Sequence, residues 1–218
     1  MGEIAGRPPS DGRSDSASDG VSALEVARVR NWQAGGAGSM LRVSERLWLA
    51  SIGKEHCDAL WHAIDASRES LRPWLPWVDA TREPGDCEVF VTAAMAERRL
   101  GSARHFALLE DDALIGVVGF NRIVERHRWA SLGYWLRSDR QGGGRMSQSV
   151  ATLVDWGFAE LELHRLEIRC AEGNSRSRAI PERLGFRQEG VLRECEWVGG
   201  RALSHVVYSR LAGDPAPG

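Results

Sequence analysis

The sequence predicts one mixed α/β domain whose sheet is largely antiparallel, with a single parallel crossover. Two hairpin patterns indicate the antiparallel strands: Asp111-Asp112 separates two apolar segments, and Gly199-Gly200 separates two more near the carboxyl end. Between these hairpins, a strand pattern at 130–136 is followed by a glycine turn at 142–144 and then by an amphipathic helix pattern. A strand, a helix and a further strand in this order are typical of a parallel crossover.

The remaining elements follow from local signals along the chain. Residues 71–78 contain two prolines, which prevent a regular helix, and two tryptophans, which offer anchoring surface. Asn174 is a favourable N-cap for a helix that Gly185 ends. The expected strands are 41–49, 105–110, 114–124, 130–136, 163–170, 188–197 and 202–211. The expected helices are 55–70, 86–99, the segment from the glycine turn to about 161, and 174–184.

The two ends of the chain differ in composition from the domain between them. Residues 1–39 are rich in Gly, Ser, Asp and Ala. Such a segment cannot bury enough apolar surface to hold a fixed fold, so we expect a disordered extension with, at most, a short helix at 21–29. The domain is expected at 40–212, followed by a tail at 213–218.

The bulk composition argues against several classes of protein. The formal net charge of −2 gives no general attraction to nucleic acid. No apolar run is long enough to cross a membrane, and the amino end lacks the apolar segment of a secretory signal. The four cysteines are scattered and the six histidines never pair at ligand spacing. We therefore expect reduced thiols, no metal site and a cytoplasmic protein.

The glycine turn predicts an anion-binding site. A strand, a glycine turn and a helix in this order aim several backbone N–H groups at one point. The partial positive charge of the helix N-terminus adds to them, so the turn is suited to a pyrophosphate. On its own the pattern also fits an ordinary tight connection between a strand and a helix.

The motifs around this turn resemble those of a known family. Gln141-Gly142-Gly143-Gly144 resembles the coenzyme A pyrophosphate loop of the GNAT (GCN5-related) N-acetyltransferases. Met146 stands where the usual loop ends in Gly or Ala, and this departure resembles the RimJ/RimL-type branch, the ribosomal-protein N-terminal acetyltransferases. Further segments similar to that branch lie at 120–123, 133–136, 183–186 and 189–190. The resemblance spans 41–211 and implies a GNAT fold: helices flanking a mostly antiparallel sheet of about seven strands, splayed between its fourth and fifth.

The resemblance implies acetyl-CoA as the acyl donor, held at this splay. The pyrophosphate is expected on the amides of the glycine turn, and the pantetheine is expected to pair with backbone groups near 135–137. The residues so implied in donor binding are Trp135, Leu136, Arg137, Gln141, Gly142, Gly143, Gly144, Arg145, Met146, Ser147 and Asn174.

The resemblance also implies two catalytic residues. Glu196 matches the proposed general base, which an acetyl transfer needs because an ammonium cannot attack a thioester. Ser177 matches the proposed acid that assists the departing thiolate, although the same serine also fits simple helix capping. Strand alternation places Glu194 on the same face as Glu196, and His205 is a third candidate base. The base therefore stays open among these three, and Glu196 also fits a surface carboxylate.

Four aromatic residues are candidates for binding the acceptor: Trp74, Trp77, Tyr134 and Tyr208. Trp74 and Trp77 fall in the region that forms one wall of the acceptor groove in the family, although hydrophobic anchoring explains them equally well. Tyr208 matches the family pattern, although a buried core aromatic is the more frequent meaning of a tyrosine in such a strand. Ser204 replaces the acidic residue that relatives commonly carry, which weakens the expectation of the family's usual contact with the amine.

Three functions are therefore compared. The first is transfer of acetyl to the N-terminal α-amine of a protein, by resemblance a ribosomal protein, in a ternary complex. An α-amine, with a pKa near 7.7–8.0, needs less help from a base than lysine near 10.4. The second is the same chemistry on a small amine such as an antibiotic. The third is an acyl-CoA-binding module without catalysis. The sequence leaves the oligomeric state, monomer or homodimer, undecided.

Overall fold

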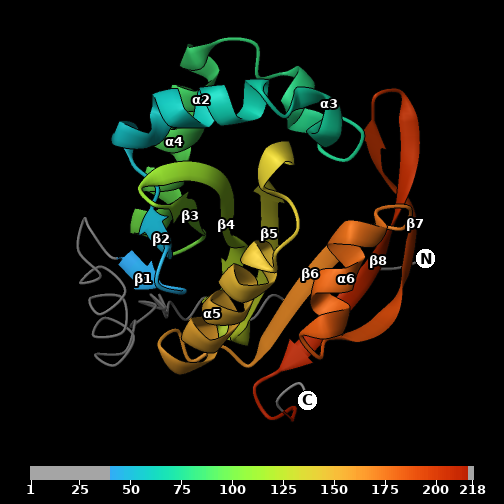
Figure 1. Ribbon diagram of the computed structural model, residues 1–218. Helices are drawn as coiled ribbons and strands as arrows, with labels where there is room; N and C mark the ends of the chain where they lie inside the picture. Colours follow the sequence, from blue (N-terminus) through green and yellow to red (C-terminus); the bar gives the residue numbers. More distant parts are fainter. Residues whose placement is uncertain (1–39, 216–218) are drawn as a thin grey trace, which may run out of the picture.

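The protein is described here by a computed structural model covering residues 40–215, and it is built on one eight-stranded sheet (Figure 1). The strand order is β1-β2-β3-β4-β5-β6-β8-β7, and every neighbouring pair is antiparallel except β5 and β6. The strands are β1 (Met40–Arg42), β2 (Leu47–Ser51), β3 (Arg104–Glu110), β4 (Ala113–Val124), β5 (Trp129–Leu136), β6 (Arg165–Ala171), β7 (Arg187–Val198) and β8 (Arg201–Leu211). The predicted fold class is confirmed.

Helices cover both faces of the sheet and divide the core in two. They are α2 (Cys57–Asp65), α3 (Arg68–Leu71), α4 (Pro84–Leu100), α5 (Arg145–Ala159) and α6 (Ser175–Arg183). The larger core lies under α5 and includes Phe106, Val118 and Leu132. The smaller core lies under α2 and α4 and includes Ala107 and Val117. Successive strand residues therefore face different helical layers, as period-two alternation requires.

Two predicted elements are wrong in detail, both near the amino end of the domain. The expected single strand 41–49 is a hairpin, because the amides of Val43 and Ser44 both donate to the carbonyl of Leu47 and turn the chain back. The sheet therefore has eight strands where seven were expected. The expected helix 55–70 is two helices, α2 and α3, separated at Ala66-Ser67. The expected helix at 21–29 lies outside the described residues.

The parallel crossover shapes the centre of the molecule. β5 and β6 pair from Trp129 with Arg165 to Leu132 with Ile168. β5 continues to Leu136, whereas its parallel pairing with β6 ends four residues earlier. The two strands diverge above this point, which is the splay that the resemblance implied.

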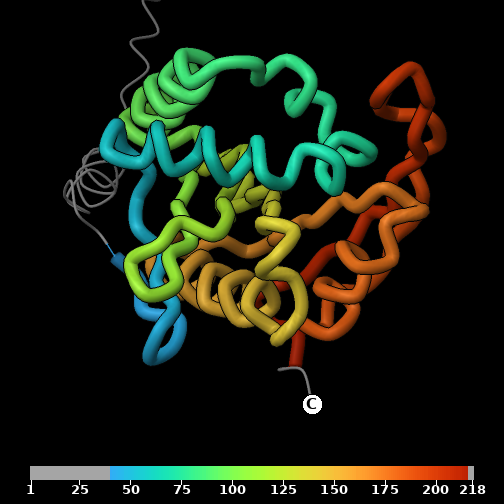
Figure 2. Tube along the Cα trace, turned by 45° about the horizontal axis from the view of Figure 1, so that its top comes forward, coloured from blue at the N-terminus to red at the C-terminus, as the bar shows by residue number. Residues whose placement is uncertain are grey.

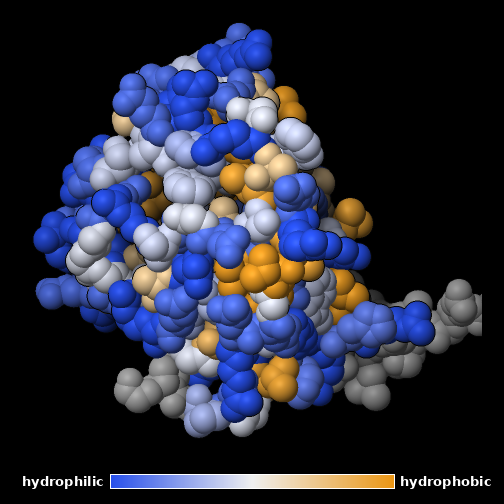
Figure 3. Space-filling view, turned by 90° about the vertical axis from the view of Figure 1, so that its right-hand side faces the viewer, coloured by the Kyte–Doolittle hydropathy of each residue, from blue (hydrophilic) through white to orange (hydrophobic). Residues whose placement is uncertain are grey.

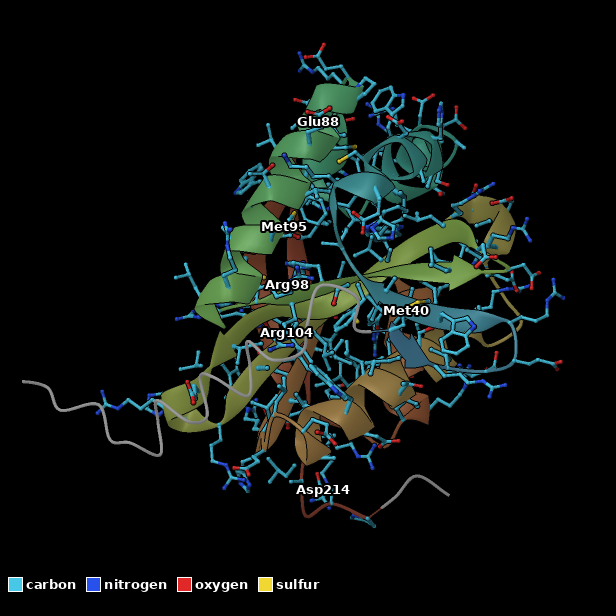
Figure 4. The ribbon with its side chains drawn as sticks, turned by 90° about the vertical axis from the view of Figure 1, so that its left-hand side faces the viewer. Met40, Glu88, Met95, Arg98, Arg104 and Asp214 are labelled. Carbon is cyan, nitrogen blue, oxygen red and sulfur yellow. The ribbon has the colours of Figure 1, made fainter. Side chains whose placement is uncertain are left out.

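The two edges of the sheet are β1 and β7. In Figure 4, Met40 lies on the edge strand β1, and Glu88 and Arg98 lie along α4. Asp214 lies at the end of the molecule opposite Glu88. At the other edge of the sheet is β7, which leaves large apolar side chains exposed, among them Trp197; Figure 3 shows hydrophobic residues gathered on this side. Between residues 40 and 215, no helix has both the length and the apolar character needed to cross a membrane.

Candidate functional site at the splay

A cleft of about 1690 Å³ opens where β5 and β6 diverge. In Figure 2, the helical layer α2–α4 and the β7–β8 hairpin rise on two sides of this point. Fifteen of the seventeen predicted site residues line the cleft. They are Trp74, Trp77, Tyr134, Trp135, Leu136, Gln141, Gly142, Gly143, Gly144, Arg145, Met146, Ser147, Asn174, Ser177 and Glu196. Arg137 and Tyr208 are outside it.

The glycine turn opens the N-terminus of α5 towards the cleft. Gly142, Gly143 and Gly144 have φ values of +86°, +61° and +74°, a conformation that L side chains rarely adopt. Gly144 is the N-cap of α5 and provides no side chain to cap it, and the first turn carries no acidic residue. The first amides of a helix have no partner within the helix, so those of α5 are available to an anion.

Two arginines of α6 face this turn from the other side of the cleft. Arg176 donates from Nη1 to the side-chain oxygen of Gln141 (2.7 Å), and Arg183 donates from Nη1 to the hydroxyl of Ser147 (2.6 Å). Both partners are neutral, and neither arginine pairs with a carboxylate within 40–215. Neither arginine was among the predicted site residues. Their seven-residue spacing, which puts them on one helical face, was the available signal.

Backbone groups of β5 also face the splay. The amide of Arg137 donates to the carbonyl of Ile115 on β4 (2.8 Å), so this pair is a hydrogen-bonded one. Because hydrogen-bonded and non-bonded pairs alternate along antiparallel strands, Trp135 also bonds towards β4. Tyr134 and Leu136 therefore aim their backbone groups the other way, into the gap where pairing with β6 has ended.

The side chain of Arg137 is not part of the cleft, which corrects its predicted role. Its guanidinium donates to both carboxylate oxygens of Asp139, at 3.0 and 2.9 Å. Its backbone amide is also engaged, as described above. The neighbouring Ser138 lines the cleft instead, and its amide donates to the hydroxyl of Ser67.

Ser177 lies within a small cluster of polar and sulfur groups. Asn174 caps α6 by accepting from the amide of Ser177 (3.1 Å), as its sequence position predicted. The hydroxyl of Ser177 donates to the sulfur of Cys170 (3.1 Å), while the hydroxyl of Tyr134 donates to the Ser177 carbonyl (3.0 Å). Burial raises the pKa of both Tyr134 and Cys170, so each stays protonated near neutral pH. The cluster therefore consists of neutral, protonated groups that are hydrogen-bonded to one another beside the cleft.

Glu196 and His205 form a pair on the opposite face of the sheet from α6. Oε2 of Glu196 lies 3.1 Å from Nε2 of His205. On β8, Val206 and Tyr208 belong to the core on the α6 side, so His205 faces the other way. Both members of the pair line the cleft, and His205 is the less exposed of the two. A carboxylate and an imidazole thus meet at the acceptor side of the splay.

Glu194 does not line the cleft beside Glu196, because regular alternation is interrupted here. The pairing of β7 with β8 shifts between Leu192 and Glu196, which leaves a bulge. Glu194 sits in this bulge with φ of +47° and is exposed, and its amide donates to the hydroxyl of Ser204 (3.1 Å). Ser204, the residue that replaces the family's acid, therefore holds the bulge that separates the two glutamates.

Tyr208 is a core residue, which corrects its predicted part in acceptor binding. It is 1% exposed, and its hydroxyl donates to Glu182 (2.7 Å) and accepts from Nε of Arg178 (2.9 Å). These contacts tie β8 to α6 beneath the cleft. Trp77 and Trp135, by contrast, pack together in the cleft wall with ring centroids 6.0 Å apart, and Trp74 lies beside Gly173.

The described residues contain no group of three or more His, Cys, Asp or Glu side chains placed to hold a metal ion. The groups that line the cleft include backbone amides, hydroxyls, guanidinium groups, thiols and the Glu196–His205 pair. An anion site at one end and a proton acceptor at the other suit the transfer of a group from a phosphate-bearing donor to a protonatable acceptor.

Comparison with known proteins identifies the family. Residues 46–187 match the family described as acetyltransferase (GNAT) domain. The ribosomal-protein-serine acetyltransferase of Escherichia coli is 30% identical over 171 residues, which is 78% of this chain and 96% of that protein. The [ribosomal protein uS5]-alanine N-acetyltransferase of Escherichia coli is 28% identical, over 72% of this chain and 85% of that protein.

A solved structure agrees with these relatives. RimL, a ribosomal L7/L12 alpha-N-protein acetyltransferase in complex with coenzyme A, superposes with a TM-score of 0.78 at 26% identity. The match covers 79% of this chain and 98% of that one. The chain therefore belongs to the GNAT family and is an N-acetyltransferase similar to the RimL type.

Proposed function

We propose that this enzyme transfers acetyl from acetyl-CoA to the N-terminal α-amine of a protein, with a ribosomal protein as the preferred acceptor. The observation that carries the proposal is the arrangement of one cleft through the sheet. The glycine turn opens into it from the α5–α6 face, and Glu196 enters it from the other face. The relatives named above supply the acceptor class.

The donor side of the cleft supports coenzyme A. The amides at the start of α5 suit the pyrophosphate, and Arg176 and Arg183 add positive charge that no carboxylate within 40–215 neutralises. The backbone groups of Tyr134 and Leu136 that face the gap suit the amides of the pantetheine arm. The arm would pair alongside β5 in the way that an added strand does. The thioester would then lie beside Ser177.

The acceptor side supports direct attack by an amine. Glu196 accepts a proton from the ammonium, directly or through one water, so that the neutral nitrogen attacks the thioester carbonyl. The C–N bond forms as the C–S bond breaks, and the second proton of the nitrogen passes to the departing thiolate, through water or the Ser177 hydroxyl, so that coenzyme A leaves as the thiol. An α-amine suits a single carboxylate, since lysine would require about 3 kcal/mol more at 1.36 kcal/mol per pKa unit.

The test compares two neighbouring glutamates on two sets of acceptors. We would follow release of the coenzyme A thiol and confirm the product by mass spectrometry, with short peptides bearing free Ser or Ala N-termini and with small amines. Glu196→Gln should lower kcat/KM on peptides by about a hundredfold or more, the usual contribution of a general base. Glu194→Gln is the matched control, because it changes an exposed carboxylate two residues away, and it should stay within about twofold.

Three outcomes would contradict the proposal. Equal losses in the two variants would remove Glu196 as the base. Thiol release with small amines alone would show that the acceptor is a small molecule and not a protein N-terminus. If acetyl-CoA binds but neither set of acceptors releases thiol, the alternative of a binding module without catalysis gains support.

A further inference from the structure

One buried carboxylate outside the cleft holds both ends of the glycine turn. Glu110 is the last residue of β3 and its side chain is 8% exposed. Its Oε1 accepts from Nε of Arg145 (2.8 Å), and its Oε2 accepts from Nη1 of Arg140 (3.3 Å). These two arginines immediately precede and follow residues 141–144. The turn is therefore closed at its base by a pair of charge-assisted hydrogen bonds to a single side chain.

The segment between the two arginines needs such an anchor. It contains three successive glycines with positive φ, and glycine loses more conformational freedom on ordering than any other residue. Arg140 ends the short helix Ser138–Arg140, and Arg145 is the first residue of α5. Glu110 thus fixes the distance between the two elements that the glycines connect.

The same carboxylate also sets where positive charge lies around the turn. The Arg145 guanidinium reaches over the turn, since Nη1 would be 2.8 Å from a Cβ on Gly143. Glu110 neutralises this charge on one side of the turn, whereas Arg176 and Arg183 of α6 have neutral partners on the other. A pyrophosphate therefore meets amides held in place and the charge of α6.

We propose that Glu110 is a positioning residue for donor binding, acting through Arg140 and Arg145 to hold the glycine turn in the conformation that receives the coenzyme A pyrophosphate. This inference rests on the proposed use of acetyl-CoA. A preformed turn binds its ligand without first losing conformational entropy, so the contribution of Glu110 belongs to affinity for the phosphates. It does not belong to the chemical step, because Glu110 touches neither Ser177 nor Glu196.

The test uses two donors that differ in their phosphates. For Glu110→Gln, we expect the Kd for coenzyme A, measured by calorimetry, to rise about tenfold, while kcat at saturating acetyl-CoA stays within about twofold. With S-acetylpantetheine, which has the thioester and no pyrophosphate, kcat/KM should be unchanged. Arg140→Gln, at a more exposed position, should raise the Kd for coenzyme A by a smaller factor and guards against a folding defect in the first variant.

Glu167→Gln is a matched control. Glu167 has an equally buried side chain and also binds two arginines, Arg165 (2.9 Å) and Arg169 (2.7 Å), but it lies on β6 away from the turn. It should leave the Kd for coenzyme A unchanged. An unchanged Kd in Glu110→Gln, or an equal loss on coenzyme A and S-acetylpantetheine, would overturn the inference. Failure of the unaltered enzyme to bind coenzyme A would instead contradict the proposed function itself.

Discussion

The hydrogen-bond partners of Glu189 lower the pKa of its carboxyl group. It accepts hydrogen bonds from Nη1 and Nη2 of Arg165, each at 2.6 Å, and from the hydroxyl of Ser209 (2.6 Å). The hydrogen bonds from Arg165, followed by that from Ser209, lower the pKa of Glu189 to about 2. These contacts join the edge strand β7 to β8 and β6. The core under α2 and α4 includes no described residue of these three strands.

This pKa predicts a pH dependence of stability. Since the pKa of Glu189 is lower in the folded chain than in the unfolded one, its charged form stabilises the fold above about pH 4.5 and loses this effect as the pH falls towards 2. Glu189→Gln should lower the free energy of unfolding by about 1 kcal/mol or less at pH 7, because the group is partly exposed. Urea unfolding at pH 7, 4 and 3 should show the difference shrinking. A difference independent of pH would contradict the assignment.

Single site residues could be predicted where their signal is local. Asn174 and Ser177 are an N-cap and its partner three residues later, and the structure has that hydrogen bond. The divergence of Glu194 from Glu196 could not be predicted, because a bulge interrupts alternation without a sequence signal. Nor could the contacts of Glu110, since its partners lie 30 and 35 residues away along the chain.

At the scale of elements, the positive φ values of the glycine turn would strain any other residue. We therefore expect a substitution in this turn to lower both the stability of the fold and the affinity for coenzyme A. Alanine at position 142 would meet no atom within 4 Å, so its cost is the positive φ alone, about 1–2 kcal/mol. Gly142→Ala should lower stability by this amount and, as the turn shifts to relieve the strain, weaken binding of coenzyme A severalfold. Thermal unfolding and calorimetry measure the two effects.

Gly199→Ala is the matched control variant for Gly142→Ala. Gly199 also has positive φ and open space, but it lies in the β7–β8 turn. Its replacement should cost comparable stability and leave the Kd for coenzyme A as it was. If both variants weakened coenzyme A binding equally, the effect would come from general destabilisation and the special role of the turn at 142–144 would be lost.

Most elements were predictable because their patterns are regular over five or more residues, as in β5 and the helix that follows the turn. The errors fell where elements are short. β1 has three residues and α3 has four, so neither is long enough for periodicity to separate it from its neighbour. The hydrogen bonds that split the expected strand 41–49 involve backbone groups, which leave no pattern in the side chains.

At the scale of the molecule, the buried side chains of the two cores within residues 40–215 come from residues 47–208, and residues 1–39 are rich in Gly, Ser, Asp and Ala. We therefore predict that a chain beginning at residue 40 keeps its stability and activity. Its melting temperature should stay within about 3 °C of the full chain, which is about 1 kcal/mol for a domain of this size. Its kcat/KM on peptides should be unchanged. A large loss in either measurement would show that residues 1–39 belong to the folded unit.

The splay has a consequence for how such an enzyme can diversify. The groups proposed for the donor come from β5, α5 and α6, whereas Glu196, His205 and Trp77 reach the cleft from the β7–β8 hairpin and the helical layer. Substitutions in the walls that contact the acceptor can therefore change its specificity while the coenzyme A site remains the same. The broken pairing at the centre of the sheet therefore separates donor binding from acceptor selection, and Glu196 is the one group on the acceptor side that the chemistry requires for every acceptor.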